Sequence, residues 1–353
     1  MQVHLQESYN ISDMGSTTAK PRVAAPALSI RDVHHSYAQR SALSLTKARR
    51  TDVLKGITLE IPEGQTLGLV GESGCGKTTL VKSILRLIQP TSGQIMLSME
   101  SGQQDILALS RAELTKVRRS LQVVFQDPYG SLNPRMTVFQ TVSEPLQVHL
   151  KLDGDACKAR VRDLLELVGL DPKMANRYPH EFSGGQRQRV GIARALAFEP
   201  KVLILDEPVS ALDVSVQAQI LNLIVGLQKK LNLTYLFVSH DLAVVEHVAD
   251  VVAVMYLGRI VEHGETSSVF RNPAHPYTQA LLSASPIPDV AAERKRSRIM
   301  LRGDITSAAG DAQGCQFLPR CPVGDGQDRC GTESPSLVEV RPGQLASCHF
   351  PRG

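Results

Sequence analysis

Short apolar runs recur along the chain between longer segments of mixed character. Four such runs lie at residues 67–70, 202–205, 233–238 and 251–255. A run of four to six apolar residues is typical of a central parallel strand, because such a strand is buried on both of its faces. The pattern therefore predicts an α/β protein built on a parallel sheet.

Other segments differ in their spacing. Residues 28–33 have strand character, and residues 57–61 alternate between apolar and polar positions with period two. Residues 128–200 instead carry helical spacing. The apolar residues that would share one helical face there are Val161, Leu164, Leu165 and Val168.

The composition and the hydrophobic patterning of the chain predict three parts. Residues 1–26 are polar and aperiodic, which is typical of a flexible tail. Residues 27–265 contain the apolar runs and are predicted to form the main domain, with a helical subdomain at about residues 128–200. Proline-rich stretches follow, so we expect residues 266–353 to form a second, smaller domain.

Charge and hydropathy exclude some classes of protein. A net charge of +4 on 353 residues is too small and too diffuse to predict a nucleic-acid partner. No uncharged apolar run approaches the roughly 18 residues that span a bilayer. The N-terminus has no apolar signal core either, so we expect a protein that is made and kept in the cytoplasm.

A glycine-rich stretch follows the first apolar run. It fits the phosphate-binding pattern G-x-x-x-x-G-K-[ST], and a predicted helix follows it. The backbone N–H groups of such a loop point at phosphate oxygens, and the helix adds the positive end of its dipole. Lys77 would reach the β- and γ-phosphates, while the Thr78 hydroxyl would bind Mg²⁺. The predicted nucleotide-binding residues are Gly71, Glu72, Ser73, Gly74, Cys75, Gly76, Lys77, Thr78 and Thr79.

Two further motifs concern phosphate chemistry. Asp206 and Glu207 close the run 202–205, where the first would hold the water shell of Mg²⁺ and the second could polarise a water in line with the γ-phosphate. A Ser-Gly-Gly sequence at residues 183–185 precedes another predicted helix and forms a second anion-binding N-terminus. One chain therefore has two phosphate-binding helix starts but one Lys-Thr, which is natural if two subunits sandwich each ATP.

With these motifs in this order, residues 28–265 resemble the ATPase subunits of ABC transporters. The resemblance implies a P-loop NTPase fold: a RecA-like parallel sheet, an antiparallel β subdomain and a helical signature subdomain, followed here by a small C-terminal extension domain. It also implies that ATP is hydrolysed with Mg²⁺ between two such subunits.

The resemblance assigns roles residue by residue. It implies that Glu207 is the catalytic base and that His240 is a switch histidine contacting the γ-phosphate. Gln126 would sense Mg²⁺, water and the membrane partner, Asp213 would belong to the D-loop, and Tyr37 would stack on adenine. The implied magnesium ligands are Thr78, Gln126 and Asp206. The signature residues, which would act on the other subunit's ATP, are Ser183, Gly184, Gly185 and Gln186.

Segments outside these motifs are similar to the ATPase subunits of dipeptide and oligopeptide importers, a group that also contains nickel importers. They are residues 127–135, residues 275–284 and the cysteine-bearing segments near the C-terminus. This resemblance implies a second ATPase subunit, identical or homologous, two transmembrane permease subunits and an extracytoplasmic solute-binding protein. The chain would then lie at the cytoplasmic face of the membrane, with short peptides as the solute.

Three rival hypotheses remain. The same machine could move nickel or another solute, since no residue of this chain contacts the solute. A soluble ABC ATPase acting on DNA or ribosomes is disfavoured by the single cassette and the proline-rich extension. A cassette that binds ATP without hydrolysing it is disfavoured by the presence of Glu207 and His240.

Four of the six cysteines lie close to the C-terminus. In a reducing compartment such a group predicts a metal site before disulfides. Their spacing lacks the Cys-x-x-Cys pair of common structural zinc sites, yet four thiolates could hold zinc or a [4Fe–4S] cluster. Resemblance to the importer extension favours iron–sulfur. The predicted ligands are Cys315, Cys321, Cys330 and Cys348.

Overall fold

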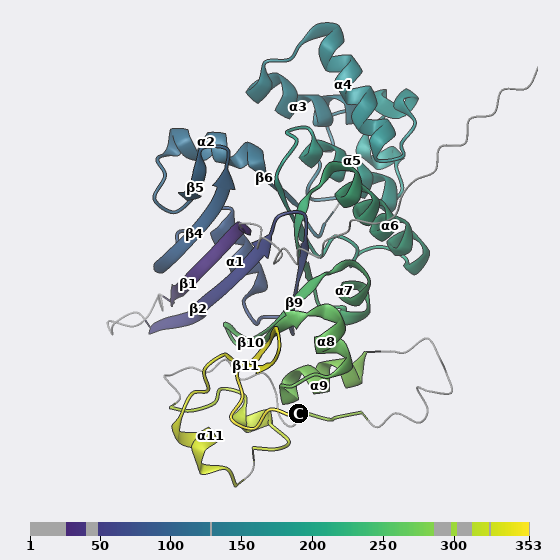
Figure 1. Cartoon of the computed structure of the whole chain (residues 1–353). Helices are drawn as coiled ribbons and strands as arrows, with labels where there is room; N and C mark the ends of the chain where they lie inside the picture. Colours follow the sequence, from purple (N-terminus) through teal and green to yellow (C-terminus); the bar gives the residue numbers. More distant parts are fainter. Residues whose placement is uncertain are drawn as a thin grey trace, which may run out of the picture.

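The computed structural model describes residues 26–39, 49–127, 129–285, 298–301, 313–324 and 326–352. The predicted tail at residues 1–26 therefore lies almost wholly outside the described residues. Two sheets and the helices around them make up the described part (Figure 1).

The larger sheet has eight strands. They are β3 (Thr66–Val70), β6 (Leu121–Val124), β7 (Val202–Asp206), β8 (Thr234–Ser239), β9 (Val251–Tyr256), β10 (Arg259–Glu265), β11 (Val338–Arg341) and β12 (Gln344–Ala346). Their order in the sheet is β11-β12-β10-β9-β3-β8-β7-β6. The five strands from β9 to β6 pair in parallel, and the remaining pairs are antiparallel. The four apolar runs form β3, β7, β8 and β9, as expected for buried central strands.

The smaller sheet is antiparallel and four-stranded, with the order β2-β1-β4-β5. Its strands are β1 (Pro26–Gln39), β2 (Arg49–Pro62), β4 (Ser92–Met99) and β5 (Gly102–Asp105). The long β1–β2 pairing joins segments on either side of residues 40–48, which are not described. This sheet is the antiparallel β subdomain that the resemblance implies.

The described residues contain ten helices, some of which cover the two faces of the larger sheet. They are α1 (Lys77–Ile84), α2 (Arg111–Ser120), α3 (Val138–Leu150), α4 (Gly154–Leu167), α5 (Gly184–Leu196), α6 (Val214–Leu231), α7 (Leu242–Val248), α8 (Thr266–Arg271), α9 (Pro276–Ala284) and α11 (Asp328–Thr332), with short 3-10 turns η1 (Pro172–Asn176), η2 (Pro179–Glu181) and η3 (Leu318–Arg320). Within the described ranges, no helix combines the length and the apolar character that crossing a bilayer requires.

Alternate residues of the central strands enter two different hydrophobic cores. Ile204 and Leu236 join α1, α2 and the smaller sheet in one core. Leu205 and Phe237 join the helices α3 to α7 in the other. Successive strand side chains point to opposite faces, so α1 and α5 lie on opposite faces of the larger sheet.

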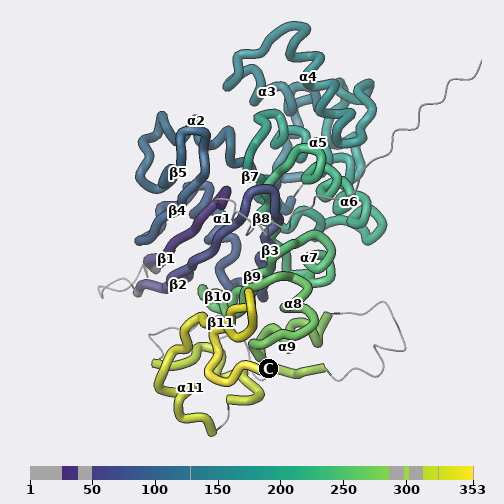
Figure 2. Tube along the Cα trace, viewed as in Figure 1, coloured from purple at the N-terminus to yellow at the C-terminus, as the bar shows by residue number. Residues whose placement is uncertain are grey.

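The C-terminal segment, which is the described part of residues 266–353, is continuous with the larger sheet. β12 pairs with β10, with Glu262 opposite Ala346. Figure 2 shows the C-terminal end close to α9, where the Arg352 amide donates to the Ala274 carbonyl (3.0 Å). Residues after 265 thus extend the sheet of the main domain, and the boundary at 265/266 stays a prediction.

One buried carboxylate holds these C-terminal elements together. The Glu262 side chain is fully buried and accepts hydrogen bonds from the Ala274 amide (2.7 Å), the His275 amide (2.9 Å) and Gln344 Nε2 (2.7 Å). A buried charge needs such donors because it has lost its hydration. Glu262 therefore fixes the start of α9 and the strand β12 against β10.

The buried His275 makes stability depend on pH. Its Nδ1 accepts from the Tyr277 amide (3.0 Å), and burial lowers its pKa to about 3. The unfolded chain, with a histidine pKa of about 6.5, binds the proton more readily. The contribution of His275 to stability is therefore complete above a pH of about 6.5 and is lost as the pH falls from there towards about 3.

Because of His275, we expect the free energy of unfolding to fall by about 2 kcal/mol between pH 7 and pH 5. Urea unfolding of the wild type and of His275→Asn at both pH values measures this, because asparagine can cap α9 without titrating. The exposed His247→Asn should lose as much stability as the wild type. An equal acid loss in His275→Asn would assign the effect to other groups.

Candidate active site

The predicted phosphate-binding segment, residues 71–79, is called the phosphate loop here. It follows β3 and includes the first turn of α1. Gly76 adopts φ 114° immediately before α1, and a side chain there would meet the Met255 Cε atom at 2.8 Å and the Val53 carbonyl at 3.0 Å. Gly74 has φ 81° with open space around its Cα. Only glycine satisfies both the left-handed backbone and the close approach at position 76. The loop thus wraps tightly and leaves its outer side open.

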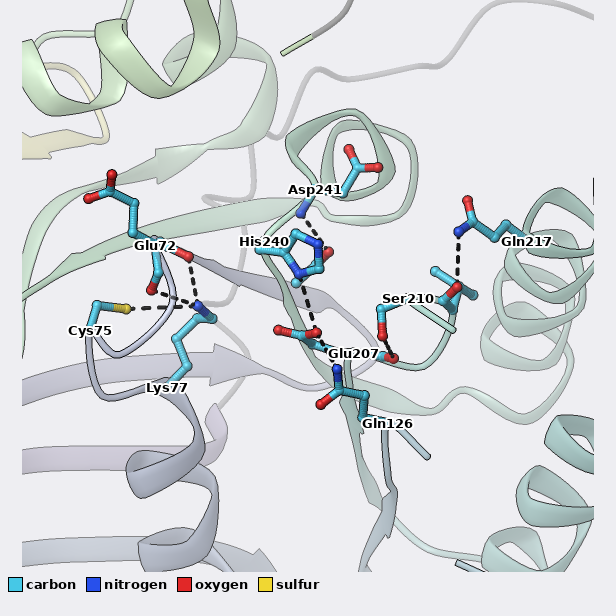
Figure 3. A network of polar contacts seen from close by, with 12 residues as sticks. Glu72, Cys75, Lys77, Gln126, Glu207, Ser210, Gln217, His240 and Asp241 are labelled. Carbon is cyan, nitrogen blue, oxygen red and sulfur yellow. Dashed lines mark hydrogen bonds and ion pairs between the residues drawn. The ribbon is translucent and has the colours of Figure 1, made fainter. Parts of the chain in front are cut away.

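Lys77 is buried within this loop. Its Nζ donates to the carbonyl oxygens of Gly71 (2.6 Å) and Glu72 (3.1 Å), and Cys75 Sγ lies 3.9 Å away (Figure 3). The ammonium group is therefore held by the carbonyls of its own loop. Thr78, in the first turn of α1, is exposed and so is Ser73. The structure brings together the predicted nucleotide-binding residues of segment 71–79.

Glu207 meets two polar side chains from neighbouring strand ends. It accepts a hydrogen bond from Gln126 Nε2 (2.9 Å), and His240 Nδ1 lies 3.2 Å from the same carboxylate oxygen. Figure 3 shows Glu207 between these two residues. The residues follow β7, β6 and β8, whose carboxyl ends meet at one edge of the parallel sheet. Glu207 itself has φ 48°, an uncommon conformation that is often found at functional sites.

Asp206 lies at the end of β7 and is buried. Burial and the neighbouring Glu207 carboxylate raise its pKa, although Lys77 and Lys82 act in the opposite direction. A nearby cation would stabilise the charged form of this buried carboxylate and so lower its pKa. Thr78, Gln126 and Asp206 offer hydroxyl, amide and carboxylate oxygens, which are the ligands that Mg²⁺ prefers. The residues present therefore fit a magnesium ion.

The signature residues begin α5. The Ser183 hydroxyl accepts from the Gln186 amide (3.3 Å), and Gln186 Oε1 accepts from the Ser183 amide (3.0 Å), which is a complete capping box. A side chain at Gly185 would meet Val216 Cγ1 at 2.4 Å, so glycine lets α5 pack against α6. Ser183 is exposed, and α5 lies on the other face of the sheet from α1.

Asp213 and Tyr37 are both exposed. Asp213 precedes α6 without capping it through its side chain. Tyr37 is 40% exposed and packs edge-on against His35, with 4.6 Å between ring centroids. It is paired in register with Thr51 on β2, two residues before the Val53 carbonyl that approaches Gly76. Tyr37 therefore lies on the strand pair that borders the phosphate loop.

Sequence reasoning missed two residues that contact the phosphate loop. The Glu72 amide donates to the Tyr277 hydroxyl (2.9 Å), and Arg320 donates to both Glu72 carboxylate oxygens (2.7 and 3.0 Å). Tyr277 lies in residues 275–284, a segment that is similar to importer ATPase subunits. Arg320 lies in the cysteine-bearing segment. Neither segment indicates from its sequence that it contacts a loop 205 or 248 residues upstream.

The four C-terminal cysteines are free thiols. The Cys315 amide donates to the Cys330 carbonyl (2.8 Å), and burial raises the pKa of Cys348 to about 11, with the other three cysteines adding to that shift. Across the described ranges, no three Cys, His, Asp or Glu side chains are arranged to hold a metal ion. Neither zinc nor the iron–sulfur cluster that we expected at these cysteines is therefore supported by the described residues.

Comparisons with known proteins agree with this geometry. Residues 54–210 match the family model described as ABC transporter, and residues 261–330 match the oligopeptide/dipeptide transporter C-terminal region. The putative oligopeptide transport ATP-binding protein YkfD of Bacillus subtilis is 50% identical over 87% of this chain and 92% of its own length. The oligopeptide transport ATP-binding protein AppF of the same organism is 47% identical over 92% and 97%.

A solved structure extends the likeness to three dimensions. The ATP-binding cassette MJ0796, a dimer in a post-hydrolysis state with ADP and Pi, matches with a TM-score of 0.58 and 29% identity, over 68% of this chain and 98% of that one. Family, fold and phosphate-loop geometry thus agree, and this chain belongs to the family of ABC transporter ATPases, in the branch that carries the oligopeptide/dipeptide transporter C-terminal region.

Proposed function

We propose that this ATPase powers the import of dipeptides or oligopeptides. The observation that carries the proposal is the match of residues 261–330 to the oligopeptide/dipeptide transporter C-terminal region, on a chain whose relatives are oligopeptide transport proteins. The chain would bind two transmembrane permease subunits at the cytoplasmic face of the membrane, and an extracytoplasmic binding protein would deliver the solute. The metal prediction for the four cysteines is not part of this proposal.

Two ATPase subunits would close on each ATP. In support, Lys77 and Ser183 begin helices on opposite faces of one sheet, so the two phosphate-binding helix starts of one chain lie on different sides of it. Ser183 and Asp213 are exposed. The related cassette MJ0796 is a dimer. Ser183, Gly184, Gly185 and Gln186 would then contact the γ-phosphate bound to the phosphate loop of the second subunit, which is identical or homologous.

Each residue near the phosphates would have a distinct role. Lys77 would exchange its loop carbonyls for phosphate oxygens. Glu207 would accept a proton from the attacking water, and His240 would contact the γ-phosphate beside it. Magnesium, held through Thr78, Gln126 and Asp206, would neutralise charge on the phosphates. Tyr37 would stack on adenine.

Gln126 would link this chemistry to the membrane partner. It donates to Glu207 from a strand end, and the segment of residues 127–135 follows directly. If Glu207 turns towards the attacking water when ATP binds, its hydrogen bond from Gln126 would break and that segment would be free to move. ATP binding then becomes a two-state switch in which closure and the Gln126 segment are coupled.

Uptake of a labelled dipeptide tests the function. Cells lacking the native gene are given this chain as the wild type or as Glu207→Gln, and both proteins are quantified at the membrane. We expect the wild type to restore uptake and the variant to leave it at background, because import needs hydrolysis.

The rivals are distinguished in the same cells. Restored nickel uptake without dipeptide uptake would transfer the function to a nickel importer. Recovery of the protein as a soluble dimer with bound nucleic acid, instead of with membrane proteins, would favour an ATPase acting on DNA or ribosomes.

A further inference from the structure

The C-terminal segment forms an ion pair with the phosphate loop. Arg320 Nη1 and Nη2 donate to the two Glu72 carboxylate oxygens at 2.7 and 3.0 Å. This is a bidentate arginine–carboxylate pair, which is both directional and strong. The Arg320 side chain is 9% exposed and that of Glu72 is 25% exposed, so water screens the pair little.

The same glutamate is also held through its backbone. Its amide donates to the Tyr277 hydroxyl (2.9 Å), and Tyr277 is fully buried. The Tyr277 ring packs against Tyr256 and Phe317, with ring centroids 4.7 and 5.5 Å apart. Phe317 lies three residues before Arg320 in the C-terminal segment. One aromatic cluster therefore positions both groups that hold Glu72.

The pair determines where the negative charge of the loop lies. Figure 3 shows the Glu72 carboxylate pointing away from Lys77, whereas the Glu72 carbonyl faces the ammonium group. Without Arg320, a partly buried carboxylate would be unpaired five residues before Lys77 in the loop that must bind a polyanion. Its charge would repel the phosphates, and it could compete with them for Lys77.

We propose that Arg320 is a positioning residue of the ATP site, which neutralises Glu72 and holds it away from the phosphates. The C-terminal segment is then a part of the nucleotide site, in addition to any role it has in transport. This inference rests on the phosphate-binding role proposed for Lys77.

Equilibrium binding of a fluorescent ATP analogue to the full chain, with Mg²⁺, tests it. Arg320→Met should weaken ATP binding by about 10- to 100-fold, the effect of removing one partner of a charged hydrogen-bonded pair. Glu72→Gln combined with Arg320→Met should return the affinity to within about threefold of the wild type, because the repelling charge is gone. Arg320→Lys keeps the charge but loses the bidentate geometry. Its ATP affinity should lie between that of Arg320→Met and that of the double variant.

Arg329→Met is the matched control, since Arg329 pairs with Glu333 on the exposed surface of the same segment (2.9 Å). It should bind ATP like the wild type. Thermal unfolding of every variant distinguishes an effect of charge from an effect on folding. If Arg320 only anchored the C-terminal segment, Arg320→Met would lower the melting temperature and the ATP affinity together, and adding Glu72→Gln would restore neither. That result, or wild-type affinity in Arg320→Met, would overturn the inference.

Lys77→Met, measured alongside, keeps the two proposals apart. Wild-type affinity in Lys77→Met would overturn the phosphate-loop proposal itself. Lost affinity in Lys77→Met together with wild-type affinity in Arg320→Met would overturn only the role of Arg320.

Discussion

Glu207→Gln should lower ATP turnover by about 100- to 10,000-fold, the range that a general base contributes. The amide cannot accept the proton of the attacking water. It can still accept the Gln126 hydrogen bond and keeps the shape of the side chain, so ATP binding and folding should remain. Phosphate release under saturating ATP measures the turnover, and nucleotide binding is measured on the same preparation.

The second expected result is an accumulation of closed dimers. If hydrolysis reopens the subunits, Glu207→Gln should remain dimeric with ATP while the wild type dissociates, which size-exclusion chromatography with light scattering resolves. Glu246→Gln, an exposed carboxylate on α7, is the control and should turn over ATP normally. Undiminished hydrolysis in Glu207→Gln would show that another group is the base.

Lys77→Met should weaken ATP binding by at least about 100-fold. The ammonium group is the cation that we propose binds the phosphates, and methionine replaces it with an uncharged side chain of similar length. The variant should still fold, because the aliphatic part of the side chain already lies buried in the loop. The loss of the hydrogen bonds to Gly71 and Glu72 should cost stability of the loop only.

Equilibrium binding and thermal unfolding together measure this effect. Lys116→Met, which removes an exposed lysine from α2, should bind ATP like the wild type. ATP binding that survives in Lys77→Met would mean that the nucleotide is held elsewhere on the chain.

Glu72 illustrates why an ATP site can depend on distant parts of a chain. The loop that we predict to bind phosphate carries an acidic residue of its own, whose charge would oppose that function. Arg320 and Tyr277 hold it from elements that lie more than 200 residues downstream. Substitutions in the C-terminal segment should therefore change ATP affinity, and they should not be read as effects on transport alone.

Local patterns along the chain were sufficient to predict the central sheet and the phosphate loop. The runs at 67–70, 202–205, 233–238 and 251–255 became buried strands, because a strand buried on both faces must be apolar throughout. The loop before α1 was predictable because its glycines and Lys77 act within a few residues of one another. The role of Glu207 came from the carboxylate pair after the run 202–205 and from family likeness, whereas the roles of His240 and Gln126 came from family likeness alone. All three stay predictions, although the structure brings these residues together.

Only the tertiary structure decided how the C-terminal segment relates to the rest. Sequence patterning predicted residues 266–353 as a smaller domain, and that division stays a prediction. The structure adds that β12 pairs with β10 in the main sheet. The grouping of four cysteines near the C-terminus predicted a metal site, yet the described residues show no group of side chains arranged as metal ligands. Strand pairing, the burial of Glu262 and the Arg320–Glu72 pair join residues 80 to 250 positions apart. Such contacts leave no local periodicity in the sequence, because they depend on which surfaces meet after the strands and helices have packed.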